Sequence, residues 1–129
     1  MKLLKGQAGQ SLIEFALVVP LLFLLIGGII DLGRIMYIYM QQDLVTQEAV
    51  RLGGLGRSDA YITSFAVNYP SITDPAKLVV TISPKDSVRK SGDYVTVTLK
   101  EPITYVTPFL NNLLPSPYVI VTNSTIRVE

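Results

Sequence analysis

The chain has 129 residues, of which 49% are hydrophobic and only 16% are charged, and its formal net charge is +1. This length allows one small domain plus one appendage, and the near-neutral charge provides no basic field that would attract nucleic acid. Histidine and cysteine are both absent, which excludes disulfides, thiol nucleophiles, thiolate metal sites and imidazole acid–base chemistry. We therefore expect a protein that is not an enzyme and that uses no cofactor.

The first thirty residues combine a short cationic start with a long apolar run. Residues 1–9 contain Lys2 and Lys5 and no acidic residue, and residues 12–30 carry a single charge, Glu14. As an α-helix, residues 12–30 would extend about 28 Å at roughly 1.5 Å per residue, close to the hydrocarbon thickness of a bilayer. The lysines favour a cytoplasmic N-terminus, so the rest of the chain is expected to be extracytoplasmic.

Three interpretations of this segment compete. A secretory signal peptide needs small residues at a cleavage site after the apolar run, but the run continues into Asp31-Leu-Gly-Arg34 without an A-x-A pattern. An uncleaved signal anchor explains the length and the lysines, but it leaves Glu14 as an uncompensated charge beside an apolar segment. A pilin precursor that is cut near its N-terminus would give Glu14 a partner.

The junction between Gly9 and Gln10 has the features that such a cut requires. Glycine suits a protease that needs an extended, unhindered backbone before the scissile bond. The cut would make Gln10 a new N-terminus with a free ammonium group, and Glu14 would become the fifth residue. In a helical stack of subunits, that carboxylate could neutralise the terminal amine of a neighbour, so that two charges that are costly alone would form a pair.

The stretch from Gly9 to Arg34 resembles the TadE-like family of pseudopilins in tight-adherence, or Flp-type, secretion systems. The shared features are a small-residue junction, a Glu-Phe-Ala core at residues 14–16, a proline within the apolar run at Pro20, and an acidic-x-Gly-Arg exit at residues 31–34. The resemblance is strong over residues 6–52 and weak beyond them. Because the family's major pilin is much shorter than this chain, the resemblance implies a minor pilin or pilin-like structural subunit.

The resemblance also implies a set of partners and a location. Such a subunit would be processed by a prepilin peptidase, would assemble with other pilin subunits through their N-terminal helices, and would contact the inner-membrane assembly machinery and the lipid bilayer. It would be a single-pass inner-membrane protein, extracellular once it is part of a pilus, with no nucleic-acid partner. The alternative is an uncleaved single-pass module that binds a partner outside the cell through its C-terminal domain.

The N-terminal helix should extend well beyond the membrane. Apolar residues after residue 31 recur at spacings of three, four or seven, which predicts an amphipathic helix that covers one side of a domain. This helix should begin near Ser11 and end at Gly53–Gly56, with a length of about 63 Å at roughly 1.5 Å per residue. The residues of the apolar stripe are Ile35, Ile38, Val45, Ala49 and Leu52.

Three features along this helix have structural interpretations. Pro20 is expected to kink or break the helix in a way that helps subunits to pack. Gly27 and Gly28 provide a flexible or close-packing point. Asp31 and Arg34 lie three residues apart near the outer membrane boundary, where they could form an interfacial ion pair or set the register with an assembly partner. The sequence leaves both roles of this pair open.

Residues 57–129 have the pattern of a small β-rich domain. Ser58 should cap a short helix over residues 59–67. Alternating apolar residues predict three strands, and a short fourth strand is expected over residues 103–106, where Pro102 would place it at an edge or after a bulge. The three main strands are expected over 78–82, 94–100 and 118–128.

Charged residues in this domain give no indication of a binding site. Lys85, Arg89 and Lys90 form a small basic loop that is expected to be solvated surface. Asp86 and Asp93 are too sparse for a calcium site, so no metal is expected.

These patterns together predict an α+β, pilin-like fold. A long N-terminal transmembrane helix should pack at its outer half against a small antiparallel sheet. The expected organisation is a leader peptide over residues 1–9, a helix over residues 10–56 with its transmembrane part at 12–30, and an extracytoplasmic β-rich domain over residues 57–129.

Overall fold

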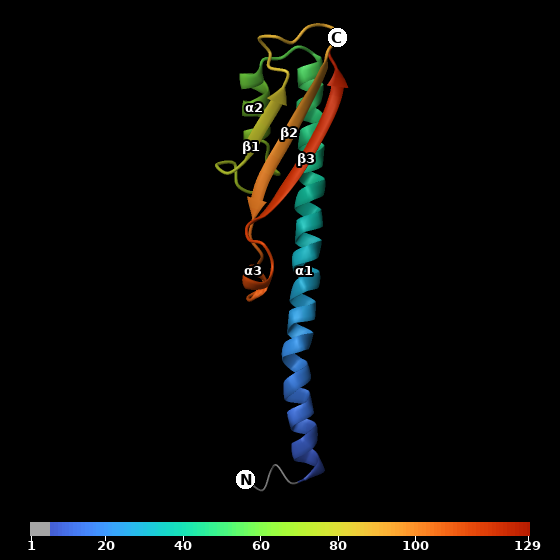
Figure 1. The fold of residues 1–129 in the computed structure, drawn as a ribbon, viewed down its shortest axis with the longest axis vertical. Helices are drawn as coiled ribbons and strands as arrows, with labels where there is room; N and C mark the ends of the chain where they lie inside the picture. The colour runs from blue at the N-terminus through green and yellow to red at the C-terminus, as the bar shows by residue number, and fades with distance from the viewer. Residues whose placement is uncertain (1–5) are drawn as a thin grey trace.

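The computed structural model describes residues 6–129, and it shows one very long helix with a small sheet packed along one end (Figure 1). This arrangement confirms the predicted α+β fold, with the sheet on the C-terminal half of the helix. The elements in chain order are α1 (Gln7–Gly54), α2 (Asp59–Val67), β1 (Val79–Ser83), β2 (Tyr94–Ile103), α3 (Leu110–Leu113) and β3 (Tyr118–Arg127).

The sheet has three antiparallel strands in the order β1-β2-β3, so that β2 is central. Val95, Val97 and Leu99 on β2 are fully buried and alternate with more exposed threonines, which confirms the expected alternation. The buried face lies against the helices, and the outer face carries threonine pairs such as Thr96 with Thr125, whose hydroxyls are 2.7 Å apart. The hydrophobic pattern therefore sets which face of the sheet covers α1.

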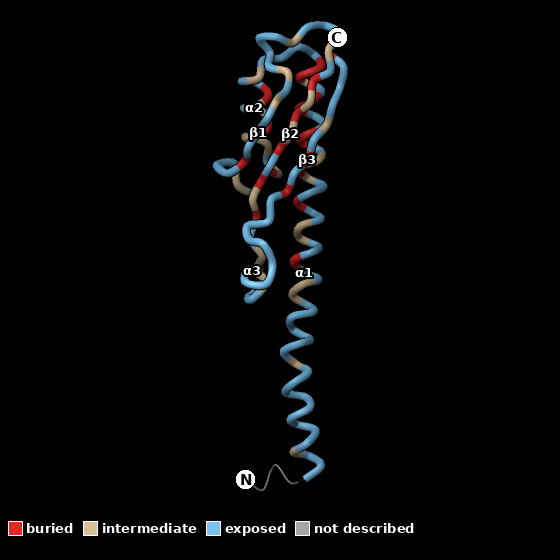
Figure 2. The backbone as a smooth tube through the Cα atoms, in the orientation of Figure 1, coloured by how far each residue is buried: buried red, intermediate tan, exposed pale blue. Residues whose placement is uncertain are grey.

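The main hydrophobic core lies toward the C-terminal end of α1, and a smaller buried cluster of Ile38, Ile103 and Ile120 lies nearer its middle (Figure 2). Val45 and Ala49 of α1 pack with Ile62 and Ala66 of α2 and with the inner face of β2. Within the described part of α1, no residue before Asp31 is buried. The helix therefore has an outer half that belongs to the domain and an inner half that the domain leaves uncovered.

The end of α1 follows the predicted glycine signal. The Arg57 N–H donates to the Leu52 carbonyl and the Gly56 N–H to the Gly53 carbonyl, at 3.1 and 3.0 Å, which is the Schellman pattern of a helix terminus. Gly56 has a φ of +75°, a left-handed conformation that glycine adopts without a Cβ clash. The turn allows α2 to fold back against α1, and its start is capped as expected by the Ser58 side chain, which accepts from the Tyr61 N–H.

The structure contradicts the prediction of a fourth strand. Residues 102 and 103 belong to the end of β2, where Pro102 pairs with Val119 and Ile103 pairs with Tyr118. β1 extends only to the Val79 pairing with Lys100, so the backbone of Pro102 faces no third strand on that side. Beyond Ile103 the chain leaves the sheet and runs as a loop beside α1.

The expected basic loop is also wrong at one position. Lys85 and Lys90 are exposed, but the Arg89 side chain is only 3% exposed. Its guanidinium lies 2.6 Å from the Asp59 carboxylate and donates to the carbonyls of Arg57 and Pro84. Arg89 therefore ties this loop to the start of α2 rather than to solvent.

Candidate assembly segment and membrane-boundary site

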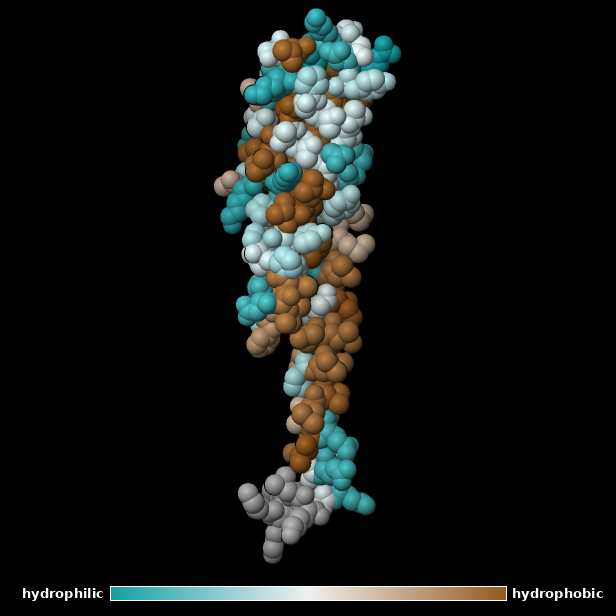
Figure 3. Space-filling view, in the orientation of Figure 1, coloured by the Kyte–Doolittle hydropathy of each residue, from teal (hydrophilic) through white to brown (hydrophobic). Residues whose placement is uncertain are grey.

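Apart from Glu14, every residue of α1 from Leu12 to Ile30 is apolar, and this part of the helix is almost wholly exposed. Figure 3 shows it as a hydrophobic column below the domain on the face in view. We call residues 10–30 the assembly segment. In the part of the chain that the structure describes, α1 is the helix that is long and apolar enough to cross a membrane, and its most apolar window contains no buried residue. A helix with no polar face has no stable aqueous surroundings, so this segment is suited to lipid or to other helices. It is compatible with single-pass membrane anchoring.

The predicted cleavage junction lies inside a helix. α1 begins at Gln7 rather than near Ser11, and Gly9 and Gln10 both donate backbone hydrogen bonds to the Gly6 carbonyl, at 2.9 and 3.3 Å. The expected extended backbone before the scissile bond is therefore not the conformation of this chain. The apolar run nucleates a helix, and the helix-forming residues Gln7 and Ala8 extend it backwards.

Glu14 is exposed at the inner end of the assembly segment. Its carboxylate accepts a hydrogen bond of 3.2 Å from the side-chain amide of Gln10, one helical turn earlier. The predicted first residue and the predicted assembly carboxylate thus lie on one face of the helix. Lys2 and Lys5, whose charges predict a cytoplasmic N-terminus, lie outside the described residues.

Pro20 does not break the helix. α1 is continuous from Gln7 to Gly54, and Pro20 is exposed on its surface. The expected break is therefore absent from α1, and a kink at Pro20 stays a prediction. Neighbouring turns hold the helix together where the proline removes one hydrogen bond.

Asp31 and Arg34 do not pair with each other; both bind the backbone of the loop that follows β2. The Asp31 carboxylate, 3% exposed, accepts from the N–H groups of Val106 and Thr107 at 2.8 and 2.9 Å. The Arg34 guanidinium donates to the Thr104 carbonyl at 2.7 Å. The two side chains therefore strap residues 104–107 onto α1, a role that neither sequence interpretation included.

The electrostatics of this strap favour a charged Asp31, which is the first residue beyond the predicted span. Burial disfavours the charged form, but hydrogen bonds from Thr107 and Val106 outweigh burial, so the pKa of the Asp31 carboxyl lies below its ordinary value of 3.8. An ionised carboxylate is a pure acceptor with room for both N–H donors. The strap is therefore in its binding form at neutral pH.

The loop over residues 104–117 descends beside the assembly segment. Thr107 packs directly against Gly27, where an added Cβ would lie 2.5 Å from the Thr107 methyl carbon, whereas a Cβ on Gly28 would meet nothing within 4 Å. Asn111 closes the loop on itself, because its side chain accepts from the Tyr105 N–H and donates to the Tyr105 carbonyl, each at 3.3 Å. Gly27 is thus a close-packing point for this loop.

A buried polar network between α1 and the sheet has no clear sequence signal. The Gln42 amide nitrogen donates to the carbonyls of Leu99 and Ile120 and to the Thr122 hydroxyl, at 2.9, 3.2 and 3.0 Å. Thr46 adds a hydroxyl contact of 2.7 Å to Thr122. Helical spacing places Gln42 beside the apolar stripe, but the acceptors that it meets come from strands far along the chain.

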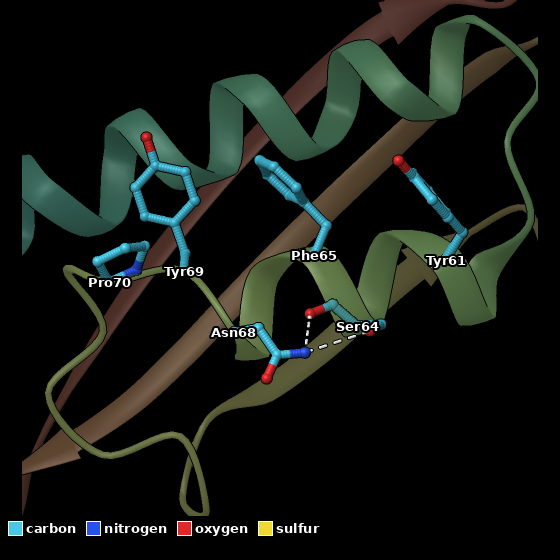
Figure 4. A pocket seen from close by; sticks show the side chains of 6 residues that line it. All are labelled: Tyr61, Ser64, Phe65, Asn68, Tyr69 and Pro70. Carbon is cyan, nitrogen blue, oxygen red and sulfur yellow. Dashed lines mark hydrogen bonds between the residues drawn. The ribbon is translucent and has the colours of Figure 1, made fainter.

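A surface cleft lies along α2. It has a volume of about 440 Å³ and is lined by side chains of α2 and by residues that directly follow it (Figure 4). Phe65 and Tyr69 line it in an edge-to-face arrangement with ring centroids 5.4 Å apart, and the Asn68 amide is taken up by the Ser64 carbonyl and hydroxyl. None of its lining residues is charged. The ionisable groups in its lining are the phenols of Tyr61 and Tyr69.

Comparison with known proteins places the assembly segment and the strap residues in one family pattern. Residues 9–51 match the family model of TadE-like proteins. No curated protein and no solved structure matches the chain. The TadE-like match covers most of α1, including Glu14, Pro20, Asp31 and Arg34, and it leaves α2 and the sheet outside. It confirms the resemblance drawn from the sequence.

Proposed function

We propose that this chain is a minor pilin or pilin-like structural subunit of a Tad/Flp-type pilus or secretion system. The observation that carries the proposal is the closeness of two boundaries. The TadE-like match begins at Gly9, the residue of the proposed junction, and the uncovered apolar run of α1 begins three residues later, at Leu12. The proposed organisation is a leader over residues 1–9, a helix over 10–56 that spans the membrane at 12–30, and an extracytoplasmic domain over 57–129.

The proposed mechanism uses proteolysis to create the partner of Glu14. A prepilin peptidase cuts the peptide bond between Gly9 and Gln10. The first turn of α1 must unwind so that this bond can enter the active site of the protease. In the intact chain the Glu14 carboxylate accepts from the neutral Gln10 amide. A neighbouring subunit's N-terminal ammonium is a stronger donor, because its positive charge adds a Coulomb attraction to the hydrogen bond. Pilin subunits and the inner-membrane assembly machinery are the proposed partners.

The processing step is tested by the intact mass of protein extracted from membranes of cells that contain the prepilin peptidase. We expect a first residue of Gln10 in the native chain. Gly9→Leu should leave the full-length precursor, because a large side chain obstructs the scissile backbone. Gly6→Leu is the matched control and should be processed normally. A native chain that retains Met1 supports the second candidate, an uncleaved anchored module.

The assembly step is tested separately with Glu14→Ala. This variant should be processed like the native chain but should fail to enter sheared pilus fractions, because the neighbour's terminal ammonium loses its counter-charge within the apolar bundle. Glu48→Ala, which removes an exposed carboxylate at the outer end of α1, is the control and should assemble. Normal incorporation of Glu14→Ala would contradict the mechanism.

A further inference from the structure

The loop over residues 104–117 has an apolar tip that the domain leaves uncovered. Phe109 is 70% exposed, Leu113 is 66% exposed and Val106 is 65% exposed. Single exposed apolar side chains occur on most proteins, but three on one short loop indicate a surface that contacts a partner or a membrane. The surroundings of the tip indicate what covers it.

The tip lies beside the proposed membrane span. Phe109 and Val106 share an apolar groove of about 480 Å³ with α1 residues that include Phe23 and Gly27, and Figure 1 shows α3 beside the middle of α1, well away from the sheet. If the span ends at Ile30, Gly27 and Phe23 lie about 5 and 10 Å inside it at roughly 1.5 Å per residue. That is the depth at which interfacial segments insert their apolar side chains.

The loop carries no charge that would oppose insertion. Glu101 and Arg127 are the nearest charged residues on either side, and residues 102–126 contain none. Tyr105 and Tyr118 lie at the two ends of the loop, with Tyr118 partly exposed. Tyrosines are the residues favoured at a membrane interface, where one end of the side chain is apolar and the other is hydrated.

Several backbone N–H and C=O groups of the loop already have hydrogen-bond partners within the protein. An irregular segment at membrane depth must find protein partners for its polar groups. Asp31 takes the N–H groups of Val106 and Thr107, and Arg34 takes the carbonyl of Thr104. Asn111 binds both backbone groups of Tyr105. In and after α3, three N–H groups donate to the carbonyls of Phe109 and Leu110, those of Asn112, Leu113 and Leu114.

We propose that the tip of the 104–117 loop inserts into the outer leaflet of the membrane beside α1, as a second lipid contact of the chain. This inference rests on the proposed orientation, with α1 spanning the bilayer at residues 12–30. Asp31 and Arg34 act as the straps that hold the loop at that depth, and Gly27 provides the space for Thr107. The bound surface is the acyl-chain region of a phospholipid leaflet.

The experiment uses the absence of tryptophan from the chain, which makes any introduced tryptophan a unique reporter. Full-length Phe109→Trp, Phe23→Trp and Tyr94→Trp are reconstituted separately in phosphatidylethanolamine and phosphatidylglycerol vesicles, with and without bromine on the acyl chains. Phe23→Trp reports on the span. Tyr94, 67% exposed at the far end of β2, provides the aqueous control.

We expect brominated lipid to quench Phe109→Trp and Phe23→Trp, and we expect both to emit further to the blue than Tyr94→Trp. Quenching of Phe23→Trp without quenching of Phe109→Trp would overturn the inference and leave the anchor standing. A blue-shifted but unquenched Phe109→Trp would also overturn it, because protein rather than lipid would cover the tip. Loss of quenching at Phe23→Trp would reject the proposed span, and the inference with it. Leu113→Trp repeats the test at a second position of the tip.

Discussion

Gly27 and Gly28 are adjacent in α1 but have opposite surroundings. Gly27 faces Thr107 so closely that a methyl group would overlap it, and Gly28 faces open space. Thr107 is short and branched at Cβ, so its side chain cannot turn aside and the loop itself must move. The two positions form a matched pair in which helix propensity changes equally but packing does not.

We predict that Gly27→Ala loosens the 104–117 loop and that Gly28→Ala does not. Alanine favours the helix by about 1 kcal/mol over glycine at either position, but at Gly27 the overlap with Thr107 should cost about 1–3 kcal/mol. Amide hydrogen exchange of residues 104–107 in detergent micelles measures the difference. Equal protection of the loop in both variants would show that the Thr107 contact does not hold it.

The sequence indicates that Asp31 and Arg34 are constrained but not which groups they bind. Helical spacing and the family pattern single out Asp31 and Arg34, and the structure finds both engaged. Their partners, Thr104, Val106 and Thr107, are at least 70 residues away. A local pattern can indicate that a charged residue is constrained, but it contains no information about which distant backbone groups meet it.

The strands and helices follow local rules more closely than single contacts do. Alternation predicts β1 and β2, and the Ser58 cap and the glycine-rich terminus predict the ends of α2 and α1. The missing fourth strand has a physical cause. After Ile103 the backbone groups are bonded to Arg34, Asp31 and Asn111, so this segment needs no strand partner.

The contact between α1 and the sheet depends on one buried amide. We predict that Gln42→Ala lowers the free energy of unfolding by about 2–3 kcal/mol, because it leaves a cavity and removes a donor from three buried oxygens. Gln47→Ala is the control. It removes an exposed amide whose partner is Asp43 one turn away, and such pairs are worth only about 0.2–0.5 kcal/mol.

Chemical denaturation in detergent micelles, followed by circular dichroism of the sheet, measures both variants. A Gln42→Ala stability equal to that of Gln47→Ala would mean that water replaces the amide at the helix–sheet contact. The network would then contribute to the orientation of the sheet rather than to its stability.

On the scale of the whole molecule, the buried residues and the proposed membrane span occupy separate parts of the chain. Every buried side chain in the described residues comes from Asp31 or later. We therefore predict that residues 28–129 fold without detergent, remain in the supernatant after ultracentrifugation and unfold in one cooperative transition. The full chain should sediment under the same conditions, because its exposed apolar helix associates. A fragment that fails to fold would show that the assembly segment contributes to the core.

The uninterrupted course of α1 has a mechanical consequence. One helix of 48 residues enters the core at one end and supplies the assembly segment at the other, and Asp31 and Arg34 brace the domain against it partway along. A force applied to the sheet is therefore transmitted to the assembly segment along one continuous helix. If α1 spans a bilayer as proposed, extracting the chain from it would require moving the domain and the helix together.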